Sequence, residues 1–168
     1  MSLEIQTIPM DDGYPAGIRT ATLADLPALV EMETAAFHSD RFNRRQFRYL
    51  LTRAQATSFV AVEADAPVAG YAIVLYRRGS QSARLYSLAV SIACRGRGLG
   101  KRLLAGAAHS AAAHGATSLH LEVRADNTVA IRLYAEQGYC ETGRLSDYYE
   151  DGETAIRMRR PITPMLSR

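Results

Sequence analysis

Apolar side chains follow the period of a helix in the first part of the chain. They recur at helical spacing at Leu26, Leu29, Val30 and Phe37. Glu33 is the polar exception on this face. Thr22 followed by Asp25 resembles a capping box, which predicts that the helix opens there. A short strand, "AGIRTAT", precedes this helix, and "FHSDRFN" ends it.

A second helix is predicted directly afterwards. Asn43 suits its N-cap, because its side chain can accept a hydrogen bond from a first-turn amide. Its apolar face consists of Phe47, Leu50, Leu51 and Ala54.

The period then shortens to that of strands. "SFVAVEA", the turn "DAP" and "VAGYAIVLY" predict a β-hairpin. After a second turn, "RRGSQSA", the segment "RLYSLAV" predicts another strand that ends at Val90. These strands form an antiparallel group.

Helices and strands alternate in the last part of the chain. We expect a helix from Gly98 to His114 with Gly115 as its left-handed C-terminal cap. The strand "SLHLEVR" and a helix from Asn127 through Tyr134 follow. "YCETGRLSDYY" and "TAIRMRR" predict a closing hairpin, with its turn in "EDGE".

The order of elements indicates a mixed α/β (α+β) fold in one domain, as expected for 168 residues. We expect an N-terminal arm over 1–16, the domain over 17–161 and a tail over 162–168. The tail is predicted to be frayed, because its prolines block regular pairing.

Composition excludes several classes of protein. Two cysteines cannot build the disulfide framework of a small secreted domain. The first residues do not form a signal peptide, and no apolar run reaches membrane-spanning length. We therefore expect a cytoplasmic protein. The net charge of +3 suits an anionic small molecule, RNA or an acidic surface, and equally a merely soluble surface.

The segment "CRGRGLGKRLL" between a strand and a helix carries the clearest chemistry. It is not a P-loop, because Arg95 stands where a glycine is required. It is not a dinucleotide fingerprint either, because Lys101 occupies the third glycine position. Its glycines allow close backbone approach, and the following helix start presents free N–H groups to an anion. A plain flexible connector is the alternative.

The pattern R-x-x-G-x-G after a strand ending in "LAV" resembles the acetyl-CoA loop of the GNAT superfamily of N-acetyltransferases. "N-x-x-A-x-x-x-Y-x-x-x-G-Y", from Asn127 to Tyr139, resembles that superfamily's second cofactor segment. The likeness covers about Ile18 to Pro161. Within the superfamily, "LEVRADNTVAIRLYAEQGY" and "SDYYEDGETAIRMRRP" are most similar to the ribosomal-protein-alanine N-acetyltransferases.

This resemblance implies the GNAT fold: a mostly antiparallel seven-stranded sheet flanked by four helices and splayed between the fourth and fifth strands. It implies acetyl-CoA as the cofactor, with coenzyme A as the product. The diphosphate is expected on the amides of Gly96 through Lys101. The cofactor-binding positions implied as a set are Leu88, Ala89, Val90, Arg95, Gly96, Arg97, Gly98, Leu99, Gly100, Lys101 and Asn127. A strand bulge near Leu88 to Val90 is expected to leave an N–H, that of Val90, free for the thioester carbonyl.

The resemblance also assigns two catalytic residues. Glu122 alternates with apolar neighbours on a strand that should lie inside the sheet, and is expected to take the proton of the acceptor amine. An exposed or salt-bridged strand acid is the alternative. Tyr134 is expected to protonate the departing thiolate, because ordinary thiol and phenol pKa values are close. A core tyrosine that covers the cofactor sulfur is its alternative.

The acceptor is less defined than the cofactor. Tyr148 and Tyr149 resemble a substrate-facing pair, although aromatic packing on a strand explains them almost as well. Asn127 also suits a helix N-cap. The chain has no tryptophan, whereas the ribosomal-alanine enzymes commonly carry Pro-Trp where "FHSDRFN" stands, so the acceptor site departs from the family pattern.

Three functions stay open at this point. The first is acetylation of a protein N-terminus, such as a ribosomal protein alanine. The second is acetylation of a small amine, and the third is acetyl-CoA binding without turnover. We expect no membrane partner, no sequence-specific nucleic acid, and a monomer or homodimer. His109 and His114 do not share a helical face, so no metal site is expected. Four arginines make the second helix basic, which suits an acidic peptide, RNA or, more commonly, solvent: Arg44, Arg45, Arg48 and Arg53.

Overall fold

The computed structural model of the protein describes residues 14–37 and 40–165. Within them the chain forms a mixed α/β fold with a seven-stranded sheet, four α-helices and two short 3-10 turns. The strands are β1 (Ile18–Thr20), β2 (Ala56–Glu63), β3 (Ala66–Leu75), β4 (Ser82–Val90), β5 (Ser118–Arg124), β6 (Cys140–Leu145) and β7 (Ala155–Pro161). The helices are α1 (Leu26–Ala36), α2 (Arg44–Thr52), α3 (Leu99–Ala113) and α4 (Thr128–Glu136).

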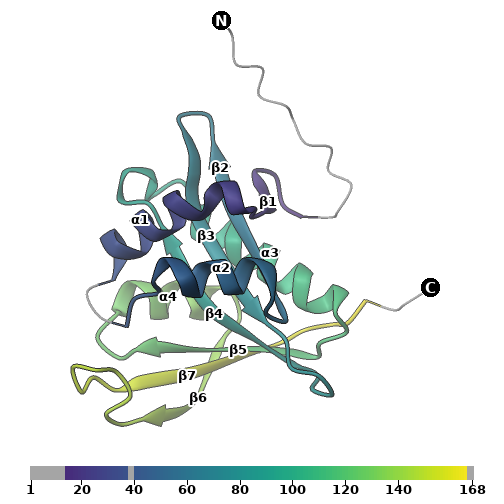
Figure 1. Ribbon diagram of the computed structural model, residues 1–168. Coiled ribbons are helices and arrows are strands. Elements are labelled where there is room, and N and C mark those ends of the chain that lie inside the picture. Colours follow the sequence, from purple (N-terminus) through teal and green to yellow (C-terminus); the bar gives the residue numbers. More distant parts are fainter. Residues whose placement is uncertain (1–13, 38–39, 166–168) are drawn as a thin grey trace, which may run out of the picture.

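The sheet has the order β1-β2-β3-β4-β5-β7-β6 (Figure 1). All neighbouring strands are antiparallel except β4 and β5. The parallel pair is short: β4 and β5 are paired only over residues 82–84 and 118–120. Within the described sheet only the edge pair β1–β2 has as few residue pairs. Beyond these residues the two strands diverge. The splay predicted between the fourth and fifth strands is therefore confirmed.

A β-bulge precedes the splayed part of β4. Ile73 pairs with Ser87 and Val74 pairs with Leu85, so Tyr86 is the extra residue. The predicted bulge is thus present, but it lies before Leu88 rather than within 88–90. An extra residue in one strand increases the local twist, which helps β4 turn away from β5.

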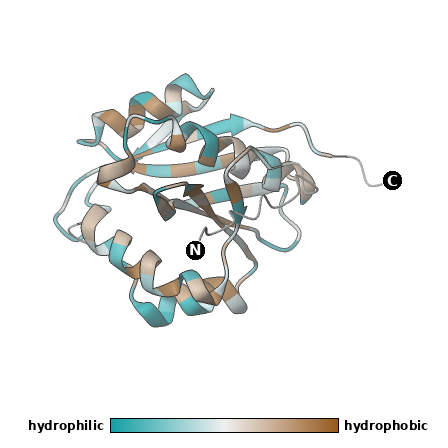
Figure 2. Cartoon of the chain, turned by 90° about the horizontal axis from the view of Figure 1, so that it is seen from above, coloured by the Kyte–Doolittle hydropathy of each residue, from teal (hydrophilic) through white to brown (hydrophobic). Residues whose placement is uncertain are grey.

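Two helical layers cover the sheet (Figure 2). On one face α1 and α2 pack against β2 and β3 through Leu29, Phe47 and Ile73. On the other face α3 and α4 pack against the strands through Leu103, Leu119 and Tyr134. In Figure 2 the apolar sides of the helices turn toward the sheet, as amphipathic helices require.

Local sequence signals explain where the helices begin and end. The Thr22 amide donates to the Asp25 carboxylate at 2.8 Å, and a 3-10 turn over Leu23–Asp25 leads into α1. Asn43 and Gln46 exchange hydrogen bonds between backbone and side chain, which fixes the start of α2. Gly115 follows α3 with a φ of 76°, the left-handed geometry that favours glycine.

Two predictions near the C-terminus were wrong. The strand over "YCETGRLSDYY" ends at Leu145, so Tyr148 and Tyr149 lie in the connection 146–154 rather than in the strand. Here Asp147 and Gly152 both have positive φ, which turns the chain out of the sheet. The tail is not frayed as far as Met165, because the amides of Ile162 and Met165 donate to the carbonyls of Thr117 and Ala112.

The predicted N-terminal arm lies outside the described residues over 1–13. Its last part is tied to the domain, since the Arg102 side chain donates to the Ala16 carbonyl at 3.1 Å. None of the helices in the described ranges has the length and apolar character needed to cross a bilayer.

Candidate active site

The glycine loop has the backbone geometry that its sequence predicts. Gly96 and Gly98 have φ values of 79° and 76°, which only glycine adopts without strain. A Cβ atom built at either position meets no heavy atom within 4 Å. The space next to the Cα atoms of these two glycines is therefore open to a ligand.

The same loop presents unused hydrogen-bond donors. Gly98 is the N-cap of α3, and the first amide of the helix with a backbone acceptor is that of Arg102, which donates to Gly98 at 3.1 Å. In the described parts of the chain, the amides of residues 96–101 have no acceptor. Adjacent free amides at a positive helix end fit a diphosphate.

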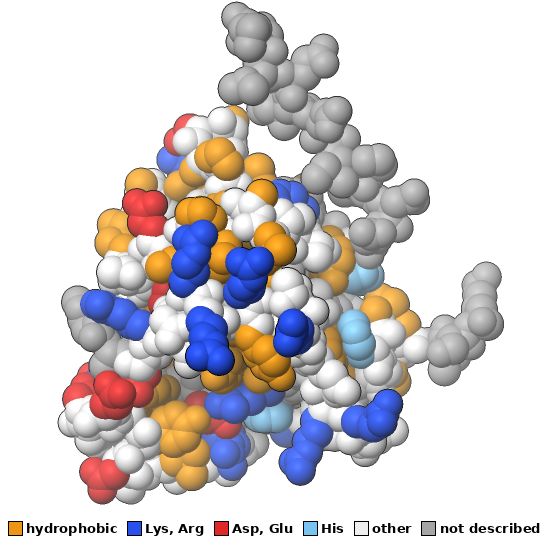
Figure 3. All heavy atoms as spheres, in the orientation of Figure 1, with side chains coloured by type: hydrophobic (Ala, Val, Ile, Leu, Met, Phe, Trp, Pro, Cys, Tyr) orange, Lys and Arg blue, Asp and Glu red, His pale blue; other side chains and the backbone are white. Residues whose placement is uncertain are grey.

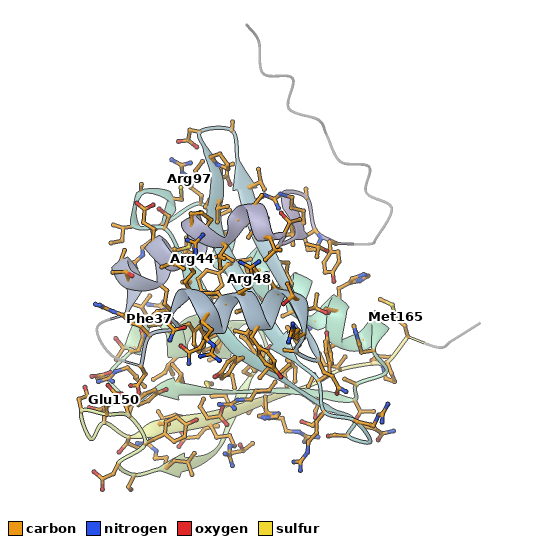
Figure 4. The ribbon with its side chains drawn as sticks, viewed as in Figure 1. Phe37, Arg44, Arg48, Arg97, Glu150 and Met165 are labelled. Atoms are coloured by element: carbon orange, nitrogen blue, oxygen red, sulfur yellow. The ribbon has the colours of Figure 1, made fainter. Side chains whose placement is uncertain are left out.

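The cations around the loop divide into two kinds. Arg97 forms an ion pair with Asp65 at 3.0 Å, and Arg102 forms one with Glu63 at 2.6 Å. Figure 4 shows Arg97 beside the β2–β3 turn that carries Asp65. Arg95 and Lys101 take part in none of the ion pairs between described residues. These two cations remain for an anionic ligand.

Two residues of the predicted loop also contribute to packing. The Leu99 side chain is 2% exposed and lies in the core. A Cβ atom at Gly100 would lie 2.9 Å from Leu133 Cδ2, so this glycine allows α3 to approach α4. A side chain at this third glycine would therefore meet Leu133, so the open space predicted for a ligand is present at Gly96 and Gly98 but not at Gly100.

The splayed end of β4 leaves backbone groups without a strand partner. The Ser91 amide donates to Ala69 on β3 at 2.8 Å. Neighbouring N–H groups along an extended strand point to opposite sides, so the Val90 N–H points into the splay. The Ala89 side chain is buried in the core, whereas Leu88 and Val90 are partly buried. This direction is the one predicted for a donor to the thioester carbonyl.

Asn127 is the N-cap of α4. Its side-chain oxygen accepts from the Ala130 amide at 3.1 Å, which confirms the capping alternative. The NH₂ group of the same side chain is not used by the cap, so a contact with the cofactor stays a prediction.

Glu122 lies on β5 with 6% of its side chain exposed. Each carboxylate oxygen accepts a hydrogen bond from a guanidinium: Arg84 Nε is 2.9 Å from Oε2 and Arg157 Nε is 3.2 Å from Oε1. The predicted mid-sheet position and the salt-bridged alternative are therefore both present. Any proton transfer at Glu122 takes place between two positive charges.

Tyr134 lies on α4 against the ring of Tyr139, with ring centroids 5.8 Å apart. Burial, and secondly the neighbouring Tyr149, raise the pKa of Tyr134 well above its ordinary value. The predicted match between thiol and phenol pKa values is therefore wrong: the buried phenol stays protonated at neutral pH, but it is a weaker acid than expected. No hydrogen bond joins Tyr134 to Glu122 in the described part of the chain.

Tyr148 and Tyr149 approach Glu122 from the connection 146–154. The Tyr148 hydroxyl accepts from Arg84 at 3.2 Å, so Arg84 links it to Glu122. The Tyr149 ring lies 5.0 Å from the Tyr148 ring and 5.0 Å from the Arg124 guanidinium. Burial first, and the nearby Tyr148 second, raise the pKa of Tyr149 to about 12.

Several residues of this region were missed in the sequence. The cations on Glu122 come from β4 and β7, and only the sheet order brings them to β5. Phe42 and Tyr86 form a ring contact of 5.0 Å at the other side of the splay. The Glu150 amide donates to Asp40 at 3.4 Å, which joins the α1–α2 loop to the β6–β7 connection. Figure 4 shows Glu150 and Phe37 at the same end of the molecule.

A second buried carboxylate lies below the α1–α2 loop. Glu33 on α1 is 2% exposed, and it accepts hydrogen bonds from the Tyr71 hydroxyl and from the Phe42 amide, the latter at 3.1 Å. The Tyr71 hydroxyl also lies 3.1 Å from Ser87 Oγ on β4. Burial raises the pKa of Glu33. The polar exception on the first helix is therefore a buried link between α1, β3, β4 and the loop.

Known proteins share this arrangement. Residues 25–139 match the acetyltransferase (GNAT) family. A streptothricin acetyltransferase of Streptomyces lavendulae is 37% identical over 64% of this chain, and this chain spans only 59% of its length. A [ribosomal protein bS18]-alanine N-acetyltransferase of Salmonella typhimurium is 32% identical over 87% of this chain and 97% of its own length.

The fold agrees with a solved structure. The crystal structure of the ribosomal-protein-S18-alanine N-acetyltransferase from Escherichia coli superimposes with a TM-score of 0.76, at 30% identity, over 90% of this chain and 96% of that one. The resemblance on which the sequence analysis relied is thereby confirmed. The chain belongs to the acetyltransferase (GNAT) family, whose enzymes use acetyl-CoA, and it is similar to the ribosomal-protein-alanine N-acetyltransferases within that family.

Proposed function

We propose that this chain transfers the acetyl group of acetyl-CoA to the α-amine of a polypeptide. The observation that supports this most is the position of Glu122. It lies at the splay, between an α1–α2 loop and a β6–β7 connection that meet through Asp40 and Glu150. The full-length similarity to acetyltransferases named for a ribosomal protein alanine supports the same acceptor class.

The loop residues fit the anionic part of the cofactor. Free amides over 96–101, the open sides of Gly96 and Gly98, and the cations Arg95 and Lys101 would bind its diphosphate. Acetyl-CoA supplies an acetyl group that is activated as a thioester. The Val90 N–H would donate a hydrogen bond to the thioester carbonyl and stabilise negative charge that develops on its oxygen.

Glu122 would take a proton from the acceptor amine. An α-ammonium has a pKa of about 8, compared with about 10.4 for lysine, so an α-amine is neutral more often near pH 7. The guanidinium groups of Arg84 and Arg157 hold the Glu122 carboxylate in place at the splay. An α-amine needs less help from such a base than a lysine side chain does, because a larger fraction of it is already neutral.

Tyr134 would hold a proton near the leaving sulfur. Its raised pKa keeps the hydroxyl protonated, so it can donate a hydrogen bond to a thiolate. Full transfer to a thiolate of ordinary pKa is uphill for such a phenol. Tyr134 would therefore stabilise the thiolate by a hydrogen bond, and solvent would supply the proton that coenzyme A finally carries.

A small amine is the second candidate acceptor. The similarity to the streptothricin acetyltransferase favours it, although this chain spans 59% of that protein. The acidic residues of the β6–β7 connection would attract a cationic amine: Asp147, Glu150, Asp151 and Glu153. The basic surface of α2 argues against this candidate, because it would repel a cationic amine.

The test is acetyl transfer measured by thiol release and mass spectrometry. The substrates are an Ala-start peptide, the same peptide with a blocked α-amine and a free lysine, and streptothricin. We expect labelling of the α-amine alone. Faster transfer to streptothricin than to any peptide would assign the small-amine function instead. Binding of acetyl-CoA without transfer to any of them would mean that the chain is a binding module.

A further inference from the structure

A groove runs along α2, beside the acceptor side of the splay. Its volume is about 700 Å³. Its lining residues include four aromatic side chains, namely Phe42, Tyr49, Tyr76 and Tyr86. Because Phe42 and Tyr86 are in ring contact and the Arg84 guanidinium lies 5.2 Å from the Tyr86 ring, the groove is continuous with the surroundings of Glu122.

The helix α2, which forms one wall of the groove and lines it with Arg45, is strongly basic. It carries Arg44, Arg45, Arg48 and Arg53, and no Asp or Glu occurs over residues 41–62. None of the ion pairs found in residues 14–37 and 40–165 involves these four arginines. Their charges are therefore not compensated by a neighbouring carboxylate.

The arginines gather on one visible face of the molecule. Figure 3 shows Lys and Arg side chains over α2 around a patch of apolar side chains. Figure 4 labels Arg44 and Arg48, which are one helical turn apart and lie along the same side of α2. Arg45 and Tyr49, also one turn apart, line the groove itself. A second hollow of about 420 Å³ on the outer face of α2 is lined by Arg45, Arg48 and Arg53.

The opposite border of the site has the reverse charge. The connection 146–154 contains four acidic residues, and only Asp151 among them forms an ion pair, with Arg124 at 2.6 Å, in the described structure. A ligand that spans both borders would be complementary if its cationic end lay near this connection and its anionic part lay along α2. A polypeptide with a free N-terminus and acidic residues after it has this polarity.

We propose that the groove along α2 binds an acidic segment that follows the N-terminus of the acceptor polypeptide. This rests on the proposed function and names the substrate class within it. The nine residues of α2 span about 13 Å, at about 1.5 Å per residue. An extended chain covers this length with about four residues. An acidic segment of about four residues would therefore extend along the whole length of the helix.

The first experiment measures binding without catalysis. Fluorescent peptides with an acetylated Ala start carry either glutamates or glutamines after the third residue, and their affinities are measured by anisotropy. We expect the glutamate peptide to bind about tenfold more tightly at low ionic strength, and this preference to fall as salt screens the charges. A blocked peptide cannot be acetylated, so this result does not depend on the proposed function.

The second experiment uses matched charge reversals. The groove variant, Arg45→Glu/Arg48→Glu, changes the groove at Arg45 and the adjoining hollow at Arg48. The control variant, Arg132→Glu/Arg144→Glu, changes the net charge equally at exposed positions on α4 and β6. The groove variant should lose the preference for glutamate, whereas the control variant should keep it. Thermal melts of both variants show whether either change unfolds the protein. The same peptides with free α-amines should show the preference in kcat/KM.

Three results would overturn the proposal. The first is equal affinity for the glutamate and glutamine peptides. The second is a preference that survives in the groove variant. The third is tight binding of an oligouridylate, or a change of oligomeric state in the groove variant, while neither peptide binds; the groove would then hold nucleic acid or a second copy of the chain. If the acidic peptide binds but is never acetylated, the proposed function fails and this proposal stands.

Discussion

The splay around Glu122 and the α1–β3 interface around Glu33 each hold a nearly buried carboxylate, in opposite surroundings. Both oxygens of Glu122 accept from guanidinium groups. In the described structure Glu33 accepts from a phenol and a backbone amide, which are both neutral, and the nearby Arg41 affects its pKa less than burial does. A carboxylate between cations is stabilised as an anion, whereas one among neutral donors carries a desolvation cost.

This difference suggests different roles for the two carboxylates, catalysis for Glu122 and structural stability for Glu33. Glu122 faces the open splay, and its partners come from β4 and β7, the two strands next to β5. Glu33 links α1 to Tyr71 and to the loop that presents Phe42. We therefore expect changes at Glu122 to act on turnover, and changes at Glu33 to act first on stability.

The largest effect is expected for Glu122→Gln. The amide keeps the size of the side chain but cannot take a proton, so kcat/KM for an α-amine should fall by about a hundredfold. Steady-state kinetics with an Ala-start peptide provide the measurement. Glu136→Gln on α4, where the side chain is 59% exposed, is the control and should leave kcat/KM unchanged. Retention of most activity in Glu122→Gln would remove its assignment as the base.

Tyr71→Phe should be the most costly change around Glu33. It removes the hydroxyl that contacts both Glu33 and Ser87, and leaves a buried carboxylate oxygen without its donor. The free energy of unfolding should fall by about 1–3 kcal/mol in urea titrations. Tyr49→Phe is the control, because Tyr49 is 57% exposed on α2. An equal loss in both variants would mean that the buried link contributes no stability.

The pH dependence of Glu33→Gln sharpens the comparison. Because burial raises the pKa of Glu33, the folded protein holds this proton more tightly than the unfolded chain does. The stabilisation is complete below the unfolded pKa of about 4.3, and it is lost as pH rises through the folded pKa. The stability of the native protein relative to Glu33→Gln should therefore decrease from about pH 4 upward. Urea midpoints that stay parallel over this range would contradict the assignment.

Arg157→Gln should have the smallest effect on stability. Its guanidinium is 47% exposed, and Arg84 still contacts Glu122 after the change. Solvent screens such a pair, so the loss should stay within about 1 kcal/mol in the same titration. A larger loss than that of Tyr71→Phe would reverse the comparison between the two carboxylates.

Most of the fold could be predicted because its signals are local. The capping pair of Asn43 and Gln46, the left-handed Gly115 and the alternation around Leu121 each specify a neighbouring element. The strand β6 was predicted too long, because the prediction included Tyr148 and Tyr149, which lie after its end at Leu145. Aromatic residues favour strands, and the positive φ of Asp147 that ends the pairing is not visible in the residue type.

The candidate site likewise contains features that local sequence predicts and features that only the fold creates. Gly96 and Gly98 are adjacent in sequence to the start of α3, so their spacing was enough to predict a left-handed glycine loop at that helix start. The partners of Glu122 are brought from positions 84 and 157 by the sheet order, which no local pattern contains. A Cβ atom added at Gly100 would lie 2.9 Å from Leu133 Cδ2 on α4, and the sequence motif contains no sign of this close approach.

The narrow parallel seam between β4 and β5 determines how the two half-sheets hold together. Three residue pairs join strands β1 to β4 to strands β5 to β7, so few backbone bonds resist their separation. A ligand bound at the diverging end would contact both half-sheets and so add to the three backbone pairs that join them.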